Sequence, residues 1–274
     1  MWKFKLSLFV ALMACFMISC ESESENISTS EDIPEEFLAD LNRLGFSTDG
    51  VTTFEDGYLV EGDIYLTEET IKELGPQNFL QLEQYSTNNL VTAVPRVITV
   101  YMPTGRRGFS SGEQAGLDEA IRRFNDENLL ITFQRTSNSS GADIVFERLR
   151  KRDERRGVLG SAGFPTASGD PFGTIRMSGI LESSFGLSVD GIATIMAHEM
   201  GHCIGFRHTD FFDRSISCGG SPSNEGDGGV GANHIPGTPT GADLEGNGSW
   251  MLACTDGSNR PFTNGDVTAL TFLY

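Results

Sequence analysis

The strongest constraint on this chain is a group of histidines in its C-terminal half. Three of its four histidines, His198, His202 and His208, lie within eleven residues, together with Glu199 and Gly205. Residues four apart on an α-helix share one face, so the first two histidines can direct their imidazoles at one point. Glycine accepts a positive φ, so Gly205 can end the helix sharply and bring the third histidine to the same point. The spacing therefore predicts a helix and turn that present three imidazoles to one metal ion.

This set of side chains favours a catalytic zinc site over a structural one. Zn²⁺ takes nitrogen ligands at about 2.0–2.1 Å and is usually four-coordinate, so three histidines leave one position open for water. Glu199 follows the first histidine and can reach that water without being a ligand. We expect Glu199 to act as the general base and then to return the proton to the leaving amine of a cleaved peptide.

The pattern from His198 to His208 has the form HExxHxxGxxH and resembles that of the metzincin clan of zinc endopeptidases. Residues 202–210, together with the small unit before the catalytic domain, look like the bacterial dual-action HEIGH metallopeptidases, and the resemblance runs from about residue 35 to the C-terminus. It implies Zn²⁺ as the cofactor and a protein or peptide as the substrate. Met200 stands where the HEIGH motif has isoleucine, which is a conservative change.

Metzincins also have a methionine in a tight turn below the metal. Met251, in Ser249-Trp250-Met251, is the candidate for this turn, although a buried methionine is also common as core filler. No tyrosine follows it closely, so the tyrosine that some metzincins hold near zinc is not carried over. Oxyanion stabilisation would then fall to zinc and a donor that the sequence does not identify.

The hydrophobic pattern predicts an α+β fold. We expect a metzincin-like catalytic domain with a twisted, mostly parallel sheet, the zinc helix and the methionine turn, preceded by a small α/β unit. The edge strand near 157–164 would hold an extended substrate by backbone hydrogen bonds. The expected strands of the larger domain are 97–101, 130–133, 142–146, 157–164 and 173–177, and its helices begin at a Ser111 cap, near Val189 and near Asp266.

The chain divides into four segments by composition. Residues 1–19 read as a lipoprotein signal peptide, 20–32 as an acidic Ser/Glu tether, 33–90 as a small unit and 91–274 as the zinc metallopeptidase domain. Within the small unit, a helix is expected from Pro34 to Gly45, strands at 51–54, 58–60 and 64–66, and a second helix after a Thr67 cap. Residues 75–92 are expected to form a linker, and His234 to lie in a loop.

The small unit contains a second group of interest. Residues 33–90 have no cysteine, so a thiol cannot block the metal from there. Val60-Glu61-Gly62-Asp63 resembles the aspartate switch of astacin-like metzincins, in which a carboxylate on zinc displaces the catalytic water. The alternative is a plain Gly-Asp turn between two short strands. We keep both interpretations open. The aspartate-switch interpretation gives the hypothesis that residues 33–90 are an inhibitory pro-region acting through Asp63.

The N-terminus indicates export and lipid anchoring. Lys3 and Lys5 precede an apolar run, 6–18, that is short for a membrane span and typical of a signal peptide. Residues 17–20 resemble a bacterial lipobox, so Cys20 is the expected lipidation site, with an ordinary secretory signal as the alternative. The acidic stretch that follows resembles surface-export signals of lipoproteins. We expect a chain anchored in the bacterial outer membrane or at the cell surface through this lipid.

Charge and cysteine content narrow the partners. The formal net charge is −18, which disfavours binding to nucleic acid. In an oxidising compartment one disulfide is expected, with Cys218–Cys254 the favoured pair and Cys203 packed in its helix. A basic run at 148–156 is expected to be a solvated hairpin, or else a substrate-contacting loop or processing site.

Two other functions remain open from the sequence. A surface lipoprotein could keep the zinc site as a binding protein without turnover, but it would have no need of Glu199. A zinc amidase acting on non-protein amides would use the same zinc and carboxylate, so the sequence does not separate it from a peptidase.

Overall fold

The structure is a computed structural model that describes residues 33–73, 84–105, 108–226, 229–239 and 241–274. The predicted signal peptide, Cys20 and the tether lie outside the described residues. In the part of the chain that is described, no helix combines the length and apolarity that a membrane span requires.

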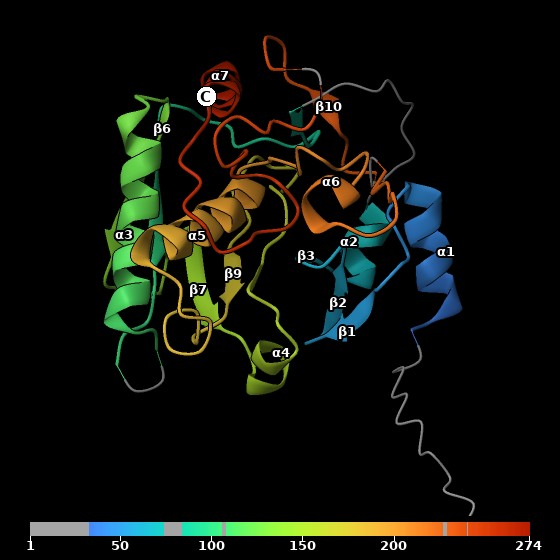
Figure 1. Cartoon of the computed structure of the whole chain (residues 1–274), viewed down its shortest axis with the longest axis horizontal. Helices are drawn as coiled ribbons and strands as arrows, with labels where there is room; N and C mark the ends of the chain where they lie inside the picture. The colour runs from blue at the N-terminus through green and yellow to red at the C-terminus, as the bar shows by residue number, and fades with distance from the viewer. Residues whose placement is uncertain (1–32, 74–83, 106–107, 227–228, 240) are drawn as a thin grey trace, which may run out of the picture. The chain divides into compact units, whose positions relative to one another are not determined.

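A five-stranded sheet forms the centre of the larger part of the protein (Figure 1). Its order is β6-β5-β7-β9-β8, and all neighbours are parallel except the antiparallel edge pair β8–β9. This confirms the prediction of a mixed α/β protein with a mostly parallel sheet. The strands are β5 (Arg96–Tyr101), β6 (Ile131–Thr136), β7 (Ile144–Arg148), β8 (Gly160–Ser161) and β9 (Thr174–Met177).

Two long helices pack together against this sheet, α3 (Ser111–Asp126) and α5 (Val189–Cys203). Helix α3 is capped by Ser110, one residue before the predicted cap, because the Ser110 hydroxyl and the Glu113 side chain form a reciprocal capping box. Gly116 lets the helices approach closely, since a Cβ there would lie 2.4 Å from Ile192 Cγ2. The helices and the sheet share one hydrophobic core, which fixes α5 relative to the edge strand β8.

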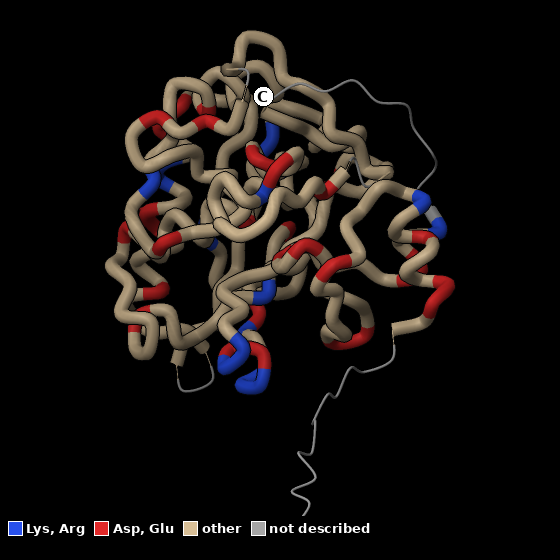
Figure 2. The backbone as a smooth tube through the Cα atoms, turned by 45° about the vertical axis from the view of Figure 1, so that its right-hand side comes forward, with Lys and Arg blue, Asp and Glu red and all other residues tan. Residues whose placement is uncertain are grey.

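The basic run at 148–156 is a short helix, α4 (Lys151–Arg155), and the predicted hairpin is wrong. Figure 2 shows basic residues concentrated in one segment at the lower edge, where α4 lies in Figure 1, whereas acidic residues are spread around the chain. Asp153 and Glu154 are buried in this helix, and Glu154 binds both Arg148 and the Gly179 amide. Two buried acids therefore anchor the helix under its exposed basic residues.

Residues 84–91 are structured, so they do not continue the predicted linker, whose first part lies outside the described residues. Strand β4 (Tyr85–Ser86) pairs with β10 (Asn233–His234), and Val91 is buried. His234 therefore lies in a short strand. The C-terminal part adds α6 (Ser215–Cys218) and α7 (Asn264–Leu273), and the predicted disulfide Cys218–Cys254 is confirmed.

The small N-terminal unit has its own hydrophobic core, built around Leu41 and Ile64. Its edge bonds to the larger sheet, because Tyr65 N–H donates to the Ala162 carbonyl and Ala162 N–H donates to the Asp63 carbonyl. The predicted elements are confirmed within a residue or two. They are α1 (Glu35–Leu44), β1 (Thr52–Phe54), β2 (Gly57–Val60), β3 (Ile64–Leu66) and α2 (Glu68–Glu73), with the three strands antiparallel.

Candidate metal centre

Helix α5 and the turn after it bring the three histidines of the sequence motif together. The helix ends at Cys203, and Gly205 has φ +105°, so the chain reverses where the sequence predicted. A side chain at Gly205 would also meet the Asn89 carbonyl at 3.0 Å. His202 and His208 are fully buried and His198 is nearly so. The glycine is thus required both for its backbone angle and for space.

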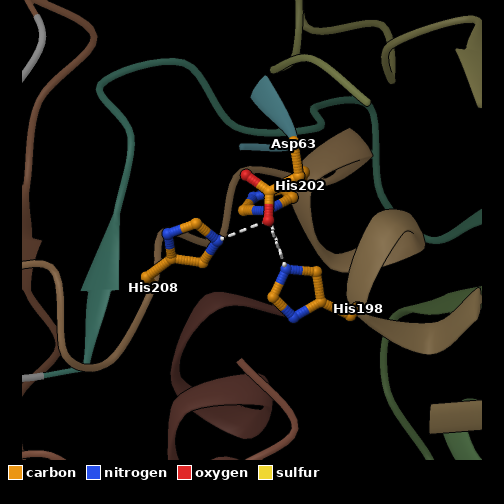
Figure 3. Close-up of side chains that lie close together, drawn as sticks. All are labelled: Asp63, His198, His202 and His208. Atoms are coloured by element: carbon orange, nitrogen blue, oxygen red, sulfur yellow. Dashed lines mark hydrogen bonds and ion pairs between the residues drawn. The ribbon is translucent and has the colours of Figure 1, made fainter. Parts of the chain in front are cut away.

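The three imidazoles converge with one carboxylate from the N-terminal unit (Figure 3). The metal-binding atoms of Asp63, His198, His202 and His208 all lie within 4.8 Å of one another. Asp63 Oδ2 is 3.1 Å from His208 Nε2 and 3.5 Å from His198 Nε2, and the Nε2 atoms of His198 and His202 are 3.1 Å apart. The structure therefore gathers three nitrogens and one oxygen around one point.

The outer nitrogen of every imidazole already has an acceptor. His198 Nδ1–H donates to the Trp250 carbonyl at 2.9 Å, and His202 Nδ1–H donates to the Phe206 carbonyl at 2.8 Å. His208 Nδ1 lies 2.7 Å from Glu225 Oε1, which is a carboxylate acceptor. Since these bonds place a proton on each Nδ1, the three Nε2 atoms face inward, where they can act as metal ligands. Two of these Nε2 atoms are 3.1 Å apart, close enough to bind one cation, and the donor set suits zinc.

The pKa values of the ionisable groups in the site are shifted by burial and by one another's charges. Burial lowers the pKa of His202 well below its usual range, and the neighbouring imidazoles act in the same direction. Burial also opposes charge on His208, but Glu225 and Asp63 outweigh it and raise the pKa of that imidazole well above its usual range. For Asp63, the nearby His208 and His198 overcome burial and hold the pKa of the carboxyl well below its usual range. The site thus offers a partly buried carboxylate to a positive charge, whether proton or metal.

Glu199 lies beside the histidines and is also buried. Burial raises the pKa of its carboxyl well above the usual range, and the charge of Asp63 raises it further. Its Oε2 has no hydrogen-bond partner among the described residues. Gly160 of the edge strand makes room for it, since a Cβ there would lie 2.3 Å from Glu199 Oε1. The carboxyl therefore lies between the edge strand and the histidines, where a reacting group could meet it.

The comparisons with known proteins agree with this chemistry. The profile of the dual-action HEIGH metallo-peptidase family matches residues 58–274. The chain belongs to that family. This confirms the resemblance seen in the sequence, and the protein is a metallopeptidase.

Among solved structures, two of myroilysin are similar to this HEIGH metallopeptidase. One matches with 15% identity and a TM-score of 0.34, over 45% of this chain and 54% of that chain, so the match spans about half the length of that protein. The other matches with 12% identity and a TM-score of 0.36, over 86% of this chain and 93% of that chain. No curated protein sequence matches it.

A buried turn around Met251 packs against helix α5 of this HEIGH metallopeptidase. Met251 is fully buried, its carbonyl accepts from Thr209 N–H, and a Cβ at Gly201 would lie 2.7 Å from its sulfur. The turn is held by Asp266, which accepts from the Ser249 hydroxyl at 2.6 Å. Gly201 is therefore needed because this turn packs directly against the helix.

One residue of the site is absent from the sequence prediction. Glu225 is fully buried, binds His208, and is flanked by Arg214 at 3.3 Å and Arg207 at 3.6 Å. Arg207 in turn lies 3.5 Å from Glu61, which neighbours the Gly62-Asp63 turn. Glu225 follows a polar stretch with no periodicity or spacing signal, so only the fold could reveal it. A buried network of charges thus connects the third histidine to the N-terminal unit.

Proposed function

We propose that this HEIGH metallopeptidase is a zinc-dependent endopeptidase of the metzincin type. His198, His202 and His208 are the zinc ligands in this proposal, and Glu199 is the general base. The observation that supports it best is the set of three Nδ1 hydrogen bonds, which leave three Nε2 atoms directed at one point beside Glu199, whose Oε2 has no hydrogen-bond partner among the described residues. Zinc bound there supplies a Lewis acid that acidifies water and polarises a peptide carbonyl.

The protein's own groups supply the proton transfers. Glu199 accepts a proton from the attacking water, and burial suits this role because it raises the pKa of the carboxyl toward working pH. As the peptide bond breaks, Glu199 gives the proton to the departing amine nitrogen. The edge strand β8, which begins at Gly160, would bind the substrate backbone, so that the substrate adds a strand to the sheet. Met251 acts in this proposal as the methionine turn that supports the ligands.

The ligand and base assignments are tested by two substitutions with a matched control. Glu199→Gln should keep about one zinc per chain and lose peptide hydrolysis by at least about two orders of magnitude. His202→Ala should lose the zinc itself, while His234→Ala, which removes the fourth histidine, should keep both zinc and activity. Metal content by mass spectrometry and hydrolysis of casein are the measurements. Full zinc occupancy in the His202 variant would move the site elsewhere.

Peptide profiling separates this function from its rivals. A binding protein without turnover would retain zinc yet leave every peptide intact, and a non-peptide amidase would cleave only small amides. Chelator should abolish the cleavage of peptides by the proposed endopeptidase, and added zinc should restore it.

We further propose that the N-terminal unit inhibits the enzyme. Asp63 supplies a fourth donor, which would complete a four-coordinate zinc site and exclude water. The same turn occupies the sheet edge through its two hydrogen bonds with Ala162. Both the open metal position and the strand that would bind substrate are therefore taken by residues 63–65. Gly62, with φ +94°, gives the turn its shape, so the plain-turn interpretation and the inhibitory one describe the same residues.

The location of the protein stays a proposal from the sequence alone. We propose a lipid anchor on Cys20 in the bacterial outer membrane or at the cell surface. Cys20→Ser should release the protein from the membrane fraction, as measured by sedimentation and immunoblotting. Continued sedimentation of the variant with membranes would remove lipidation as the anchor.

A further inference from the structure

A cavity of about 230 Å³ opens beside the metal centre. His198, Glu199 and Asp63 are among its lining residues, so a side chain that enters it would lie beside the groups proposed to act on the scissile bond. Ile195, Val158 and Leu252 give it apolar walls. At roughly 30 Å³ per water, it has room for about seven waters, enough for one extended side chain.

One wall of this cavity is held in a fixed shape. This wall is formed by residues 252–255, directly after Met251. Ala253 N–H donates to Asp210 at 2.8 Å, Cys254 N–H donates to the Ser217 hydroxyl at 2.9 Å, and the disulfide joins Cys254 to Cys218. Three separate ties make this a pre-formed pocket, which is typical of a specificity site.

Arg260 lines the cavity and is buried. Its Nη1 donates to the Cys254 carbonyl at 2.8 Å, while its Nε has no hydrogen-bond partner among the described residues. Its ion-pair partner among the described residues, Asp256, is 3.6 Å away and 69% exposed, so water screens this pair. The other cavity arginine, Arg214, is already paired with buried Glu225 at 3.3 Å. Of these two arginines, Arg260 is therefore the one whose positive charge a ligand in the cavity can neutralise.

We propose that this cavity is the specificity pocket of the enzyme and that Arg260 selects an acidic side chain next to the scissile bond. The inference rests on the proposed peptidase function and deepens it. A glutamate or aspartate would place its carboxylate on the guanidinium and its methylenes along the apolar walls. A neutral side chain would displace the water that hydrates the buried guanidinium without supplying a counter-charge, which disfavours binding.

Matched peptides test this in the full-length Asp63→Ala protein, in which the metal is expected to be open. The substrates are pairs of fluorogenic peptides, one pair for each of the two positions that flank the cleaved bond. Within a pair, the peptides differ only in having glutamate or glutamine at that position. The acidic peptide should be preferred roughly ten- to hundredfold in kcat/KM at one of the two positions, the range of hydrogen bonds to charged groups. Arg260→Gln should bring this ratio close to one, Arg260→Lys should restore part of it, and Arg156→Gln, an exposed arginine, should leave it unchanged.

A binding measurement keeps the pocket separate from the catalysis. The same peptides are titrated into the zinc-loaded Asp63→Ala, Glu199→Gln protein, which should bind without cleaving. Acidic preference in binding supports the pocket even if no variant turns over, and in that case the peptidase function fails alone. Cleavage with no acidic preference at either position, or a preference that survives Arg260→Gln, overturns the pocket and leaves the peptidase function standing.

Discussion

The two sides of the metal site are built in different ways. The helix side consists of one continuous segment, His198 to His208, whose ligands are spaced by helix geometry and one glycine. The other side is the turn at Asp63, which is 145 residues away from His208 in the sequence and reaches the site through a separate small unit. The first side belongs to the main core, whereas the second rests on a smaller core that the N-terminal unit forms together with Val230.

This difference indicates a division of labour. Residues of the main core should be needed for the metal and the reaction, whereas residues of the N-terminal unit should be needed only to keep the site closed. Substitutions on the two sides are therefore expected to have opposite effects on activity.

The largest effect is expected on the N-terminal side. Asp63→Ala removes the fourth donor, and the activity of the full-length chain should rise by up to roughly a hundredfold, within the usual range of coupling free energies. Initial rates on a quenched peptide, measured at saturating zinc, report this. Asp49→Ala, an exposed acid on the same unit, serves as the control and should change nothing. Equal rates in all three proteins would leave the unit as a spacer or folding aid.

A smaller effect of opposite sign is expected on the helix side. Glu225→Gln removes the buried charge that orients His208 and faces Arg207 and Arg214. Zinc affinity should fall roughly tenfold or more, as is typical when a group that orients a metal ligand is changed. Competition with a fluorescent chelator measures this, with the exposed Glu147→Gln as the matched control. An unchanged zinc affinity would show that the hydrogen bond matters and the charge does not.

The smallest effect on activity tests whether the small core controls access. Leu41→Ala creates a cavity in the N-terminal unit, and a buried Leu→Ala change costs about 2–5 kcal/mol. Hydrogen exchange in α1 should accelerate, and activity should rise by less than in Asp63→Ala because the carboxylate is retained. Leu117→Ala in α3 is the counterpart in the main core and should destabilise without activating. Activation by both variants alike would mean that the two cores open together.

Local patterns in the sequence were sufficient for much of the fold. The helix that carries His198 and His202, the stop at Gly205 and the succession of strands along the chain from β5 to β9 follow from periodicity and glycine placement, which act over a few residues. The cap of α3 was displaced by one residue because Ser110 and Ser111 are equally good caps, and only the Glu113 contact selects between them.

Features that depend on distant partners could not be predicted in this way. The polar residues around Tyr85 suggested a linker, yet they form a strand because their partner is at Asn233–His234. The basic run forms a helix in which Glu154 is buried and binds Arg148 and the Gly179 amide, and the sequence does not indicate these partners. Glu225 and Arg260 likewise acquire their surroundings only from the folded chain. Asp63 was singled out by motif resemblance alone, with no periodicity to support it.

Trp250, whose carbonyl accepts the hydrogen bond from His198, also carries an indole ring that can report on the site by fluorescence. Trp250 is one of only two tryptophans, and the other, Trp2, lies within the predicted signal peptide. Its indole is buried against Phe124, Phe206 and Phe262. After removal of the predicted signal peptide, the tryptophan fluorescence of the chain would come from this one ring. Zinc loading, departure of Asp63 and unfolding of the main core could then each be followed in real time on the unlabelled enzyme.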